Sequence, residues 1–134
     1  MQRIVIIGAG AIGSALGGLL RRAGHDVLLV GRQAHVQAIQ AAGLHVDGVL
    51  GAFDVRIDAA VALDARPDLA FLTVKSQDVR AALQAHRQLL QGVPIVTFQN
   101  GVRSDDIAAG VVPQDRIVSA VVNFHASFLQ PGAV

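Results

Sequence analysis

The chain has 134 residues and a formal net charge of +1, and 52% of its residues are hydrophobic against 16% charged. This composition predicts one globular domain with a real core and excludes a disordered chain. The small charge and the absence of Tyr and Trp argue against a nucleic-acid-binding surface.

Other absences narrow the function further. No apolar run approaches the roughly 18 residues of a membrane span, and Met1 leads straight into the first predicted strand, which leaves no signal peptide. We therefore expect a cytoplasmic protein that does not contact a membrane. The lack of Cys excludes disulfides and thiolate metal sites. No second His follows or precedes His45 at a sequence spacing typical of metal ligands, so no metal site is expected.

The chain opens with a strand-like run, residues 3–7, which passes into a glycine-rich turn and then into a segment with helical spacing. The turn has the pattern G-x-G-x-x-G, and in this context it predicts dinucleotide binding. Gly8 allows a sharp turn, Gly10 lets a pyrophosphate approach the backbone, and Gly13 lets the helix pack closely. The N–H groups at the helix start favour an anion. The alternative is an ordinary strand-to-helix turn.

The first helix is predicted at residues 12–23, and Gly24 ends it. A second buried strand at residues 26–30 completes a β-α-β unit of a parallel sheet. Arg32 follows this strand, where an acidic residue would bind the ribose of NAD and an arginine the extra phosphate of NADP. Because a guanidinium can hold a phosphate through two parallel hydrogen bonds, we predict NADP. A solvated loop arginine is the alternative.

A second helix is predicted at residues 33–42, followed by a β-hairpin made of residues 44–46 and 53–57, which alternate apolar and polar around a glycine-rich turn. The later elements complete an α/β pattern. They are a strand at 68–74, a helix at 77–90 capped by Ser76, a strand at 94–98, a short helix at 105–109, a strand at 116–122 and a turn at 130–132. His45 is expected on an exposed strand, and His25, His35 and His86 are expected to be structural.

Two polar residues at predicted strand ends are further candidates. Ten of the 11 basic residues are Arg, so Lys75, the only lysine, stands out. Lys75 follows the strand at 68–74, and Asn100 follows the next strand. Functional residues in open α/β sheets collect at such carboxyl ends. A surface lysine and a common Asn-Gly turn are the alternatives.

Several stretches resemble the ketopantoate reductase (2-dehydropantoate 2-reductase) family: IVIIGAGAIG, LLVGR, TVKSQD, TFQNG and the closing HASFLQPGAV, together with the hairpin insertion. The resemblance implies a Rossmann-type, doubly wound, mostly parallel sheet over residues 1–134. It also implies a C-terminal helical domain for substrate binding and dimerisation, which this chain lacks. The residues that the resemblance assigns to NADPH are Gly8, Ala9, Gly10, Ala11, Ile12, Gly13, Arg32, Lys75, Asn100 and Ala126, and Asn100 would also contact the substrate.

In this family a hydride passes from the nicotinamide to the ketone of a small 2-oxo acid, and the proton donor is a lysine on the second domain. Lys75 does not match that lysine, so the resemblance implies no catalytic residue in this chain, and cofactor binding without normal turnover. His125 as the acid is a less favoured interpretation. Apolar surface left by the missing domain favours a homodimer.

Two other functions stay open. One is a nucleotide-sensing module made of a single Rossmann unit, although such modules usually carry an acidic residue at the position of Arg32. The other is a related dehydrogenase that acts on opines, glycerol phosphate or hydroxyacids.

Overall fold

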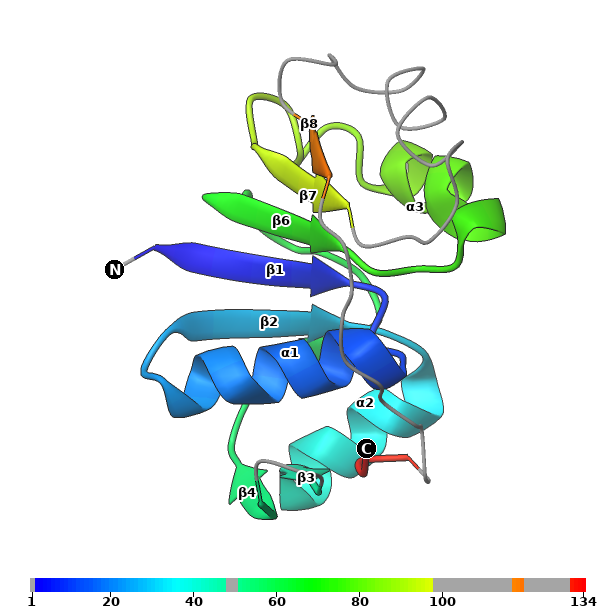
Figure 1. Ribbon diagram of the computed structural model, residues 1–134. Helices are drawn as coiled ribbons and strands as arrows, with labels where there is room; N and C mark the ends of the chain where they lie inside the picture. Colours follow the sequence, from blue (N-terminus) through cyan, green and yellow to red (C-terminus); the bar gives the residue numbers. More distant parts are fainter. Residues whose placement is uncertain (1, 48–50, 98–116, 120–130) are drawn as a thin grey trace.

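A computed structural model describes residues 2–47, 51–97, 117–119 and 131–134. Its main strands are β1 (Arg3–Ile7), β2 (Asp26–Val30), β5 (Asp58–Ala60), β6 (Leu69–Leu72), β7 (Ile95–Thr97) and β8 (Ile117–Ser119). They form one parallel sheet in the order β5-β2-β1-β6-β7-β8 (Figure 1). The chain runs outward from β1 to β5 and then returns to β6, so the direction of winding reverses between β1 and β6. The predicted doubly wound α/β fold is confirmed.

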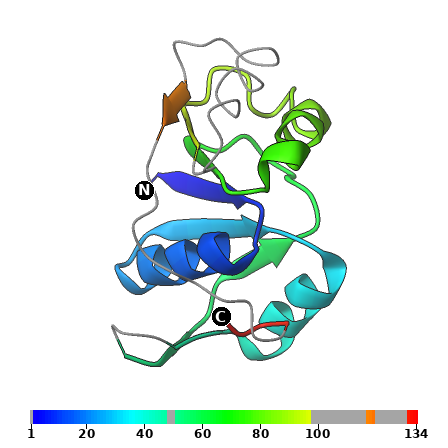
Figure 2. The same cartoon turned by 45° about the vertical axis from the view of Figure 1, so that its right-hand side comes forward.

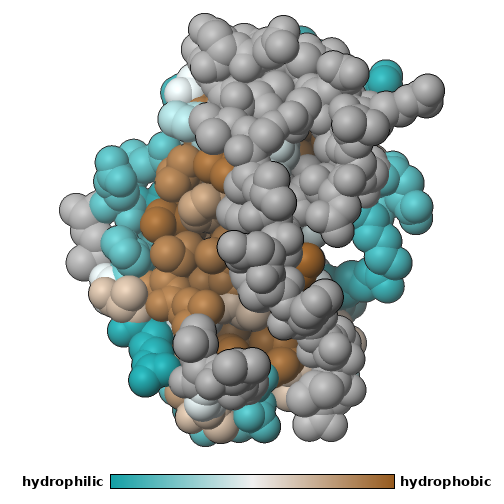
Figure 3. Space-filling view, in the orientation of Figure 1, coloured by the Kyte–Doolittle hydropathy of each residue, from teal (hydrophilic) through white to brown (hydrophobic). Residues whose placement is uncertain are grey.

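Helices cover both faces of this sheet (Figures 1 and 2). One face packs on α1 (Ala11–Arg22) and α2 (Gln33–Ala42), and the other packs on α3 (Val79–Ala85). The side chains of β1 alternate between the two cores, because successive strand residues point to opposite faces. Figure 3 shows apolar side chains gathered on the surface over the sheet and α1. No helix in the described ranges is long and apolar enough to span a membrane.

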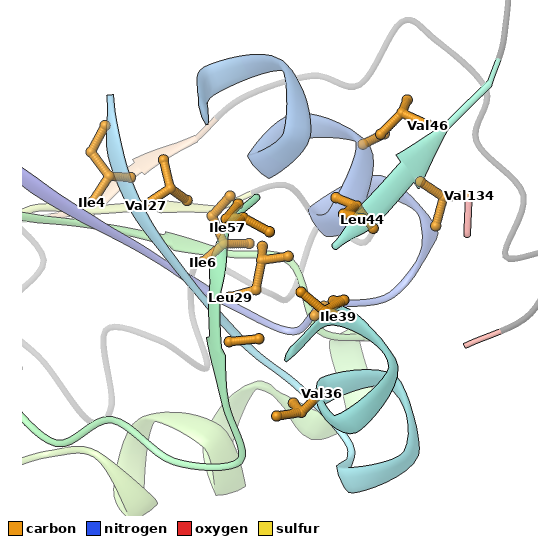
Figure 4. Packing of buried hydrophobic residues seen from close by; sticks show 13 residues of the cluster. Ile4, Ile6, Val27, Leu29, Val36, Ile39, Leu44, Val46, Ile57 and Val134 are labelled. Carbon is orange, nitrogen blue, oxygen red and sulfur yellow. The ribbon is translucent and has the colours of Figure 1, made fainter. Parts of the chain in front are cut away.

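The predicted hairpin is confirmed as the antiparallel pair β3 (Leu44–Val46) and β4 (Phe53–Val55), which forms a small sheet of its own. The end of the chain joins it, which the sequence did not predict. The N–H of His45 donates to Gly132 O at 2.8 Å, and the N–H of Val134 donates to His45 O at 3.0 Å. Val134 is buried and lies beside Leu44 and Val46 (Figure 4). Residues 131–134 therefore close the core of the hairpin.

The hairpin prediction missed one strand. Residues 53–57 were expected to form a single hairpin strand, but β4 ends at Val55 and β5 begins at Asp58, where the chain joins the main sheet beside β2. The three residues of β5 are Asp, Ala and Ala, which have low strand propensity. Tertiary contacts select the strand: Ala59 is buried, and Gln40 Nε2 donates to Ala59 O at 2.8 Å.

The helix predicted at 77–90 is shorter in the structure, and its start differs. Residues Ser76–Asp78 form a 3₁₀ turn, η1, and Asp78 rather than Ser76 is the N-cap of α3. At the other end, the N–H of His86 bonds Gln84 O, and the imidazole Nδ1 of His86 donates to Ala82 O at 2.9 Å. The imidazole thus bonds the Ala82 carbonyl, to which the backbone N–H of His86 would donate if the helix continued. Leu90, at the end of the predicted helix, still packs in the core although it lies beyond α3.

The buried strand β2 gives a test of the core. Leu29 has 0% exposure, and Leu29→Ala removes packing that the neighbouring side chains cannot fully restore. We expect the free energy of unfolding to fall by about 2–5 kcal/mol, measured by urea denaturation. Val61→Ala is the control, because Val61 is 59% exposed and its truncation should change stability by less than about 0.5 kcal/mol. Equal effects of the two substitutions would contradict this account of the core.

Candidate functional site

A cleft of about 750 Å³ opens at the carboxyl ends of β1, β2 and β6. Open α/β sheets bind their ligands at this edge, and ligand pockets commonly measure about 300–1,000 Å³. Of the predicted cofactor residues, the structure brings residues 8–11, Arg32 and Lys75 together around the cleft. Ile12 and Gly13 follow directly in α1.

A second cleft, of about 650 Å³, lies at the opposite ends of the strands. Arg3 lines it and pairs with the carboxylates of Asp26 and Asp58, so ion pairs within the sheet already neutralise part of its charge. The candidate site is therefore the cleft at the carboxyl ends.

The glycine-rich turn is fixed by backbone contacts to the neighbouring strands. The N–H groups of Gly8 and Ala9 both donate to Val30 O at 2.9 Å. Gly8 has a φ of +109°, and a Cβ there would lie 2.6 Å from the backbone nitrogen of Val74. Only glycine fits this position, as the motif predicted.

Gly13 and Gly10 differ in what surrounds them. A Cβ on Gly13 would lie 2.2 Å from Gly8 O and 2.5 Å from Thr73 Oγ1, so the start of α1 packs directly against the turn. Thr73 Oγ1 itself donates to Gly8 O at 2.7 Å. A Cβ on Gly10 would meet nothing within 4 Å. This open, exposed side of Gly10 lies on the cleft and leaves room for a phosphate to approach the backbone.

The start of α1 suits an anion. Gly10 is the N-cap and supplies no side-chain cap, and the first turn of the helix has no acidic residue. The first N–H groups of a helix have no intrahelical acceptor, and the helix dipole places partial positive charge there. A dinucleotide pyrophosphate fits these donors, which the cleft leaves accessible at Gly10 and Ala11.

Two exposed cations flank this turn. Arg32 is the N-cap of α2 and follows β2 after one residue, and Lys75 follows β6. Because β1 lies between β2 and β6, the glycine-rich turn has one cation on each side. The described lining also contains one carboxylate, that of Asp78, whose N–H donates to Lys75 O at 2.8 Å. Negative charge is therefore favoured most on the side of Arg32.

His35 is a buried histidine in the wall of the cleft, with 3% exposure. Its Nε2 lies 2.8 Å from Ser14 Oγ, and its Nδ1 accepts from the N–H of Gly132 at 2.8 Å. A ring nitrogen that accepts a hydrogen bond carries no proton, so His35 is neutral in this arrangement. Desolvation by burial lowers the pKa of His35 below its ordinary value.

This pKa shift makes stability depend on pH. The unfolded chain protonates His35 near its ordinary pKa of about 6.5, whereas the folded chain does so only at lower pH. The contribution of neutral, buried His35 to the free energy of unfolding is therefore complete above about pH 6.5. It is lost as the pH falls toward the pKa of His35 in the folded chain. We expect His35→Gln to flatten this part of the curve of unfolding free energy against pH, measured by urea denaturation between about pH 5 and pH 8. Parallel curves for the two proteins would contradict the assignment.

Two predicted site residues, Asn100 and Ala126, lie outside the described residues, as do the Asn100-Gly101 turn and His125. No group of three or more His, Asp, Glu or Cys residues in the described part of the chain could hold a metal ion.

Sequence reasoning missed several residues of the cleft. Thr73 holds Gly8 from the neighbouring strand, but its partner is 65 residues away in sequence. Val61 follows β5 and leaves an exposed apolar side chain on the cleft. His35 was expected to be structural, and its contact with Ser14, 21 residues earlier, had no local signal. Three-dimensional proximity alone reveals these residues.

The parallel sheet, its switch point and the glycine-rich cleft define a Rossmann-type domain whose cleft has the shape and position of a dinucleotide site. The family is equally clear: the model of the family described as ketopantoate reductase PanE/ApbA matches residues 4–134, and the chain belongs to this family.

Individual relatives agree with this family. The chain is 42% identical over 106 residues to the 2-dehydropantoate 2-reductase of Pyrococcus abyssi. This match covers 78% of this chain and 35% of the relative. A crystal structure of a PanE/ApbA family ketopantoate reductase from Ralstonia eutropha JMP134 superposes with a TM-score of 0.88 at 33% identity, covering 98% of this chain and 45% of that one. A ternary structure of D-mandelate dehydrogenase with NADH and anilino(oxo)acetate gives a TM-score of 0.90 at 28% identity, covering 98% and 44%. The chain thus spans less than half the length of these relatives.

Proposed function

We propose that this chain is the cofactor-binding half of an NADPH-dependent 2-oxo acid reductase that converts 2-dehydropantoate to pantoate in pantothenate biosynthesis. One observation supports this most: the cleft gathers the glycine-rich turn, Arg32 and Lys75 at the switch point of the sheet. Family membership supplies the reaction class, since its members are oxidoreductases that use a nicotinamide dinucleotide.

In this proposal the cofactor lies across the carboxyl ends of β2, β1 and β6. The N–H groups at the start of α1 bind the pyrophosphate, and Arg32 binds the 2′-phosphate. Lys75, on the other side of the turn, binds toward the ribose and nicotinamide end. Asn100 and the backbone of Ala126 are proposed to contact the cofactor there, and Asn100 the substrate, by resemblance to the family.

The bound cofactor would supply a hydride to the ketone carbon of the substrate. The residues of this chain bind and orient the reactants. Negative charge that develops on the ketone oxygen needs a proton donor, and we assign that donor to a second, helical domain rather than to Lys75. We likewise assign the main substrate contacts and the homodimer contacts to the complete protein.

Arg32 gives the first test of this proposal. Arg32→Ala removes the charged donor for the 2′-phosphate, and we expect NADPH affinity to fall about 10- to 100-fold. NADH affinity should change little, because NADH has no 2′-phosphate. Fluorescence titration of both cofactors measures the two dissociation constants.

Arg66→Ala is the matched control, since Arg66 is an exposed arginine that does not line the cleft. Equal affinity of the unmodified chain for NADPH and NADH would overturn the assignment. The NADH-bound D-mandelate dehydrogenase makes this a real alternative among similar folds.

A second test uses the length of the chain. If the proton donor lies on another domain, the 134-residue chain should bind NADPH and still show negligible oxidation of it in the presence of 2-dehydropantoate. The measurement is the decrease in NADPH absorbance, with a full-length relative as the positive control. Sustained turnover by the chain alone would place the donor within these residues.

The similarity to D-mandelate dehydrogenase favours one second candidate, a related reductase with another 2-oxo acid substrate. This candidate shares the cofactor site and differs in the substrate pocket. Assays of the complete protein with a panel of 2-oxo acids separate the two candidates.

A further inference from the structure

A line of hydrogen bonds connects the end of the chain to the glycine-rich turn. The N–H of Gly132 donates to His35 Nδ1 at 2.8 Å, His35 Nε2 lies 2.8 Å from Ser14 Oγ, and Ser14 Oγ donates to Ala9 O at 3.1 Å. The side chains of Ser14 and His35 are buried, with 0% and 3% exposure. Buried polar groups of this kind make hydrogen bonds of well-defined geometry.

The direction of each bond follows from the first. Since His35 Nδ1 accepts a proton from Gly132, the neutral ring carries its own proton on Nε2 and donates it to Ser14 Oγ. The Ser14 hydroxyl then has its proton available for Ala9 O. All three donors point the same way, from the end of the chain to the turn.

The contact at Ala9 O orients a peptide of the cofactor site. In a trans peptide the C=O and the following N–H point in opposite directions. Ser14 holds the carbonyl of Ala9 toward α1, so the N–H of Gly10 points away from it, at the residue whose open side faces the cleft. The hydroxyl of Ser14 thereby fixes a donor that a phosphate would use.

The other end of the line is a docked segment, residues 131–134, which lies against α2 and β3 (Figure 1). Besides the bond from Gly132 to His35, three backbone hydrogen bonds join this segment to His45 and Asp47. Its last two residues are buried in the hairpin core, and Pro131 lines the cleft. The segment therefore contacts both the hairpin and the candidate site.

We propose that Ser14 and His35 are positioning residues that couple the docking of residues 131–134 to the geometry of the glycine-rich turn. A nicotinamide dinucleotide then binds more tightly when this segment is docked, and the bound cofactor in turn holds the segment in place. The inference rests on the proposed function, because it needs a cofactor at the turn. In a two-domain reductase this segment would lead to the second domain, so the same line would relate cofactor binding to the position of that domain.

Three substitutions break the line at different points. Ser14→Ala removes the hydroxyl, and His35→Gln removes the ring. Gly132→Ala disfavours docking, because Gly132 has a φ of +85° and a Cβ there would lie 3.1 Å from the Cβ of Ala38. Each should raise the dissociation constant of NADPH about five- to tenfold, a common size for coupling between sites, in fluorescence titrations of the folded variants.

Gly24→Ala is the matched control for Gly132→Ala. Gly24 has a φ of +100° and a Cβ there would meet nothing within 4 Å, so it carries the same backbone strain away from the cleft. We expect it to lower the melting temperature without changing NADPH affinity. The Ser14, His35 and Gly132 variants could likewise lower only the melting temperature and bind NADPH as the unmodified chain does. In that case the three residues have a structural role and the proposal is overturned.

Hydrogen–deuterium exchange tests the coupling from the other side and keeps the proposal falsifiable if a variant fails to fold. Coupling between two sites is reciprocal, so saturating NADPH should slow amide exchange in residues 131–134 and β3 of the unmodified chain. Ser14→Ala should abolish this protection. Unchanged exchange in an unmodified chain that binds NADPH overturns the coupling alone, whereas an unmodified chain that binds neither NADPH nor NADH overturns the proposed function together with it.

Discussion

The carbonyl oxygen of Val30 accepts hydrogen bonds from two consecutive N–H groups, those of Gly8 and Ala9. This shared acceptor fixes the end of β1 against the end of β2 and sends the chain into α1. Thr73 adds a contact from β6 through the carbonyl of Gly8. Three neighbouring strands are thereby joined at one turn, and this junction sets the position of the glycine-rich turn in the candidate site.

The order of the strands distributes charge around the junction. Arg32 follows β2 and Lys75 follows β6, so two cations stand on either side of the helix start. Asp78 adds a carboxylate to the lining near Lys75, since its N–H donates to Lys75 O. A ligand with a central pyrophosphate and one lateral phosphate matches this distribution when its lateral phosphate lies beside Arg32.

The parts of this structure that the sequence predicts are those with local causes. The turn at residues 8–13 follows from glycine spacing between a strand and a helix, and α2 begins and ends where the sequence predicts. The missed parts depend on distant contacts. Strand β5 has weak propensity and exists because β2 and Gln40 hold it.

The candidate site divides in the same way. Arg32 is predicted from the position that distinguishes NAD from NADP, and Lys75 because it is the only lysine in the sequence. Both follow strands of one parallel sheet, whose carboxyl ends lie at the same edge. The role of His35 depends on Ser14 and Gly132, 21 residues before it and 97 residues after it. No periodicity in the sequence could reveal that arrangement.

The central position of β1 also bears on how the protein folds. β1 pairs with β6, and residue 4 lies opposite residue 69, so β1 cannot complete its pairing until a segment about 65 residues later in the sequence is in place. Closing such a long loop lowers the conformational entropy of the chain before the strand contacts form. Parallel sheets therefore assemble slowly. The glycine-rich turn gains its contact with Thr73 only after that step. The candidate site is therefore complete only in the assembled sheet, and a ligand that binds there would stabilise the whole domain rather than one loop.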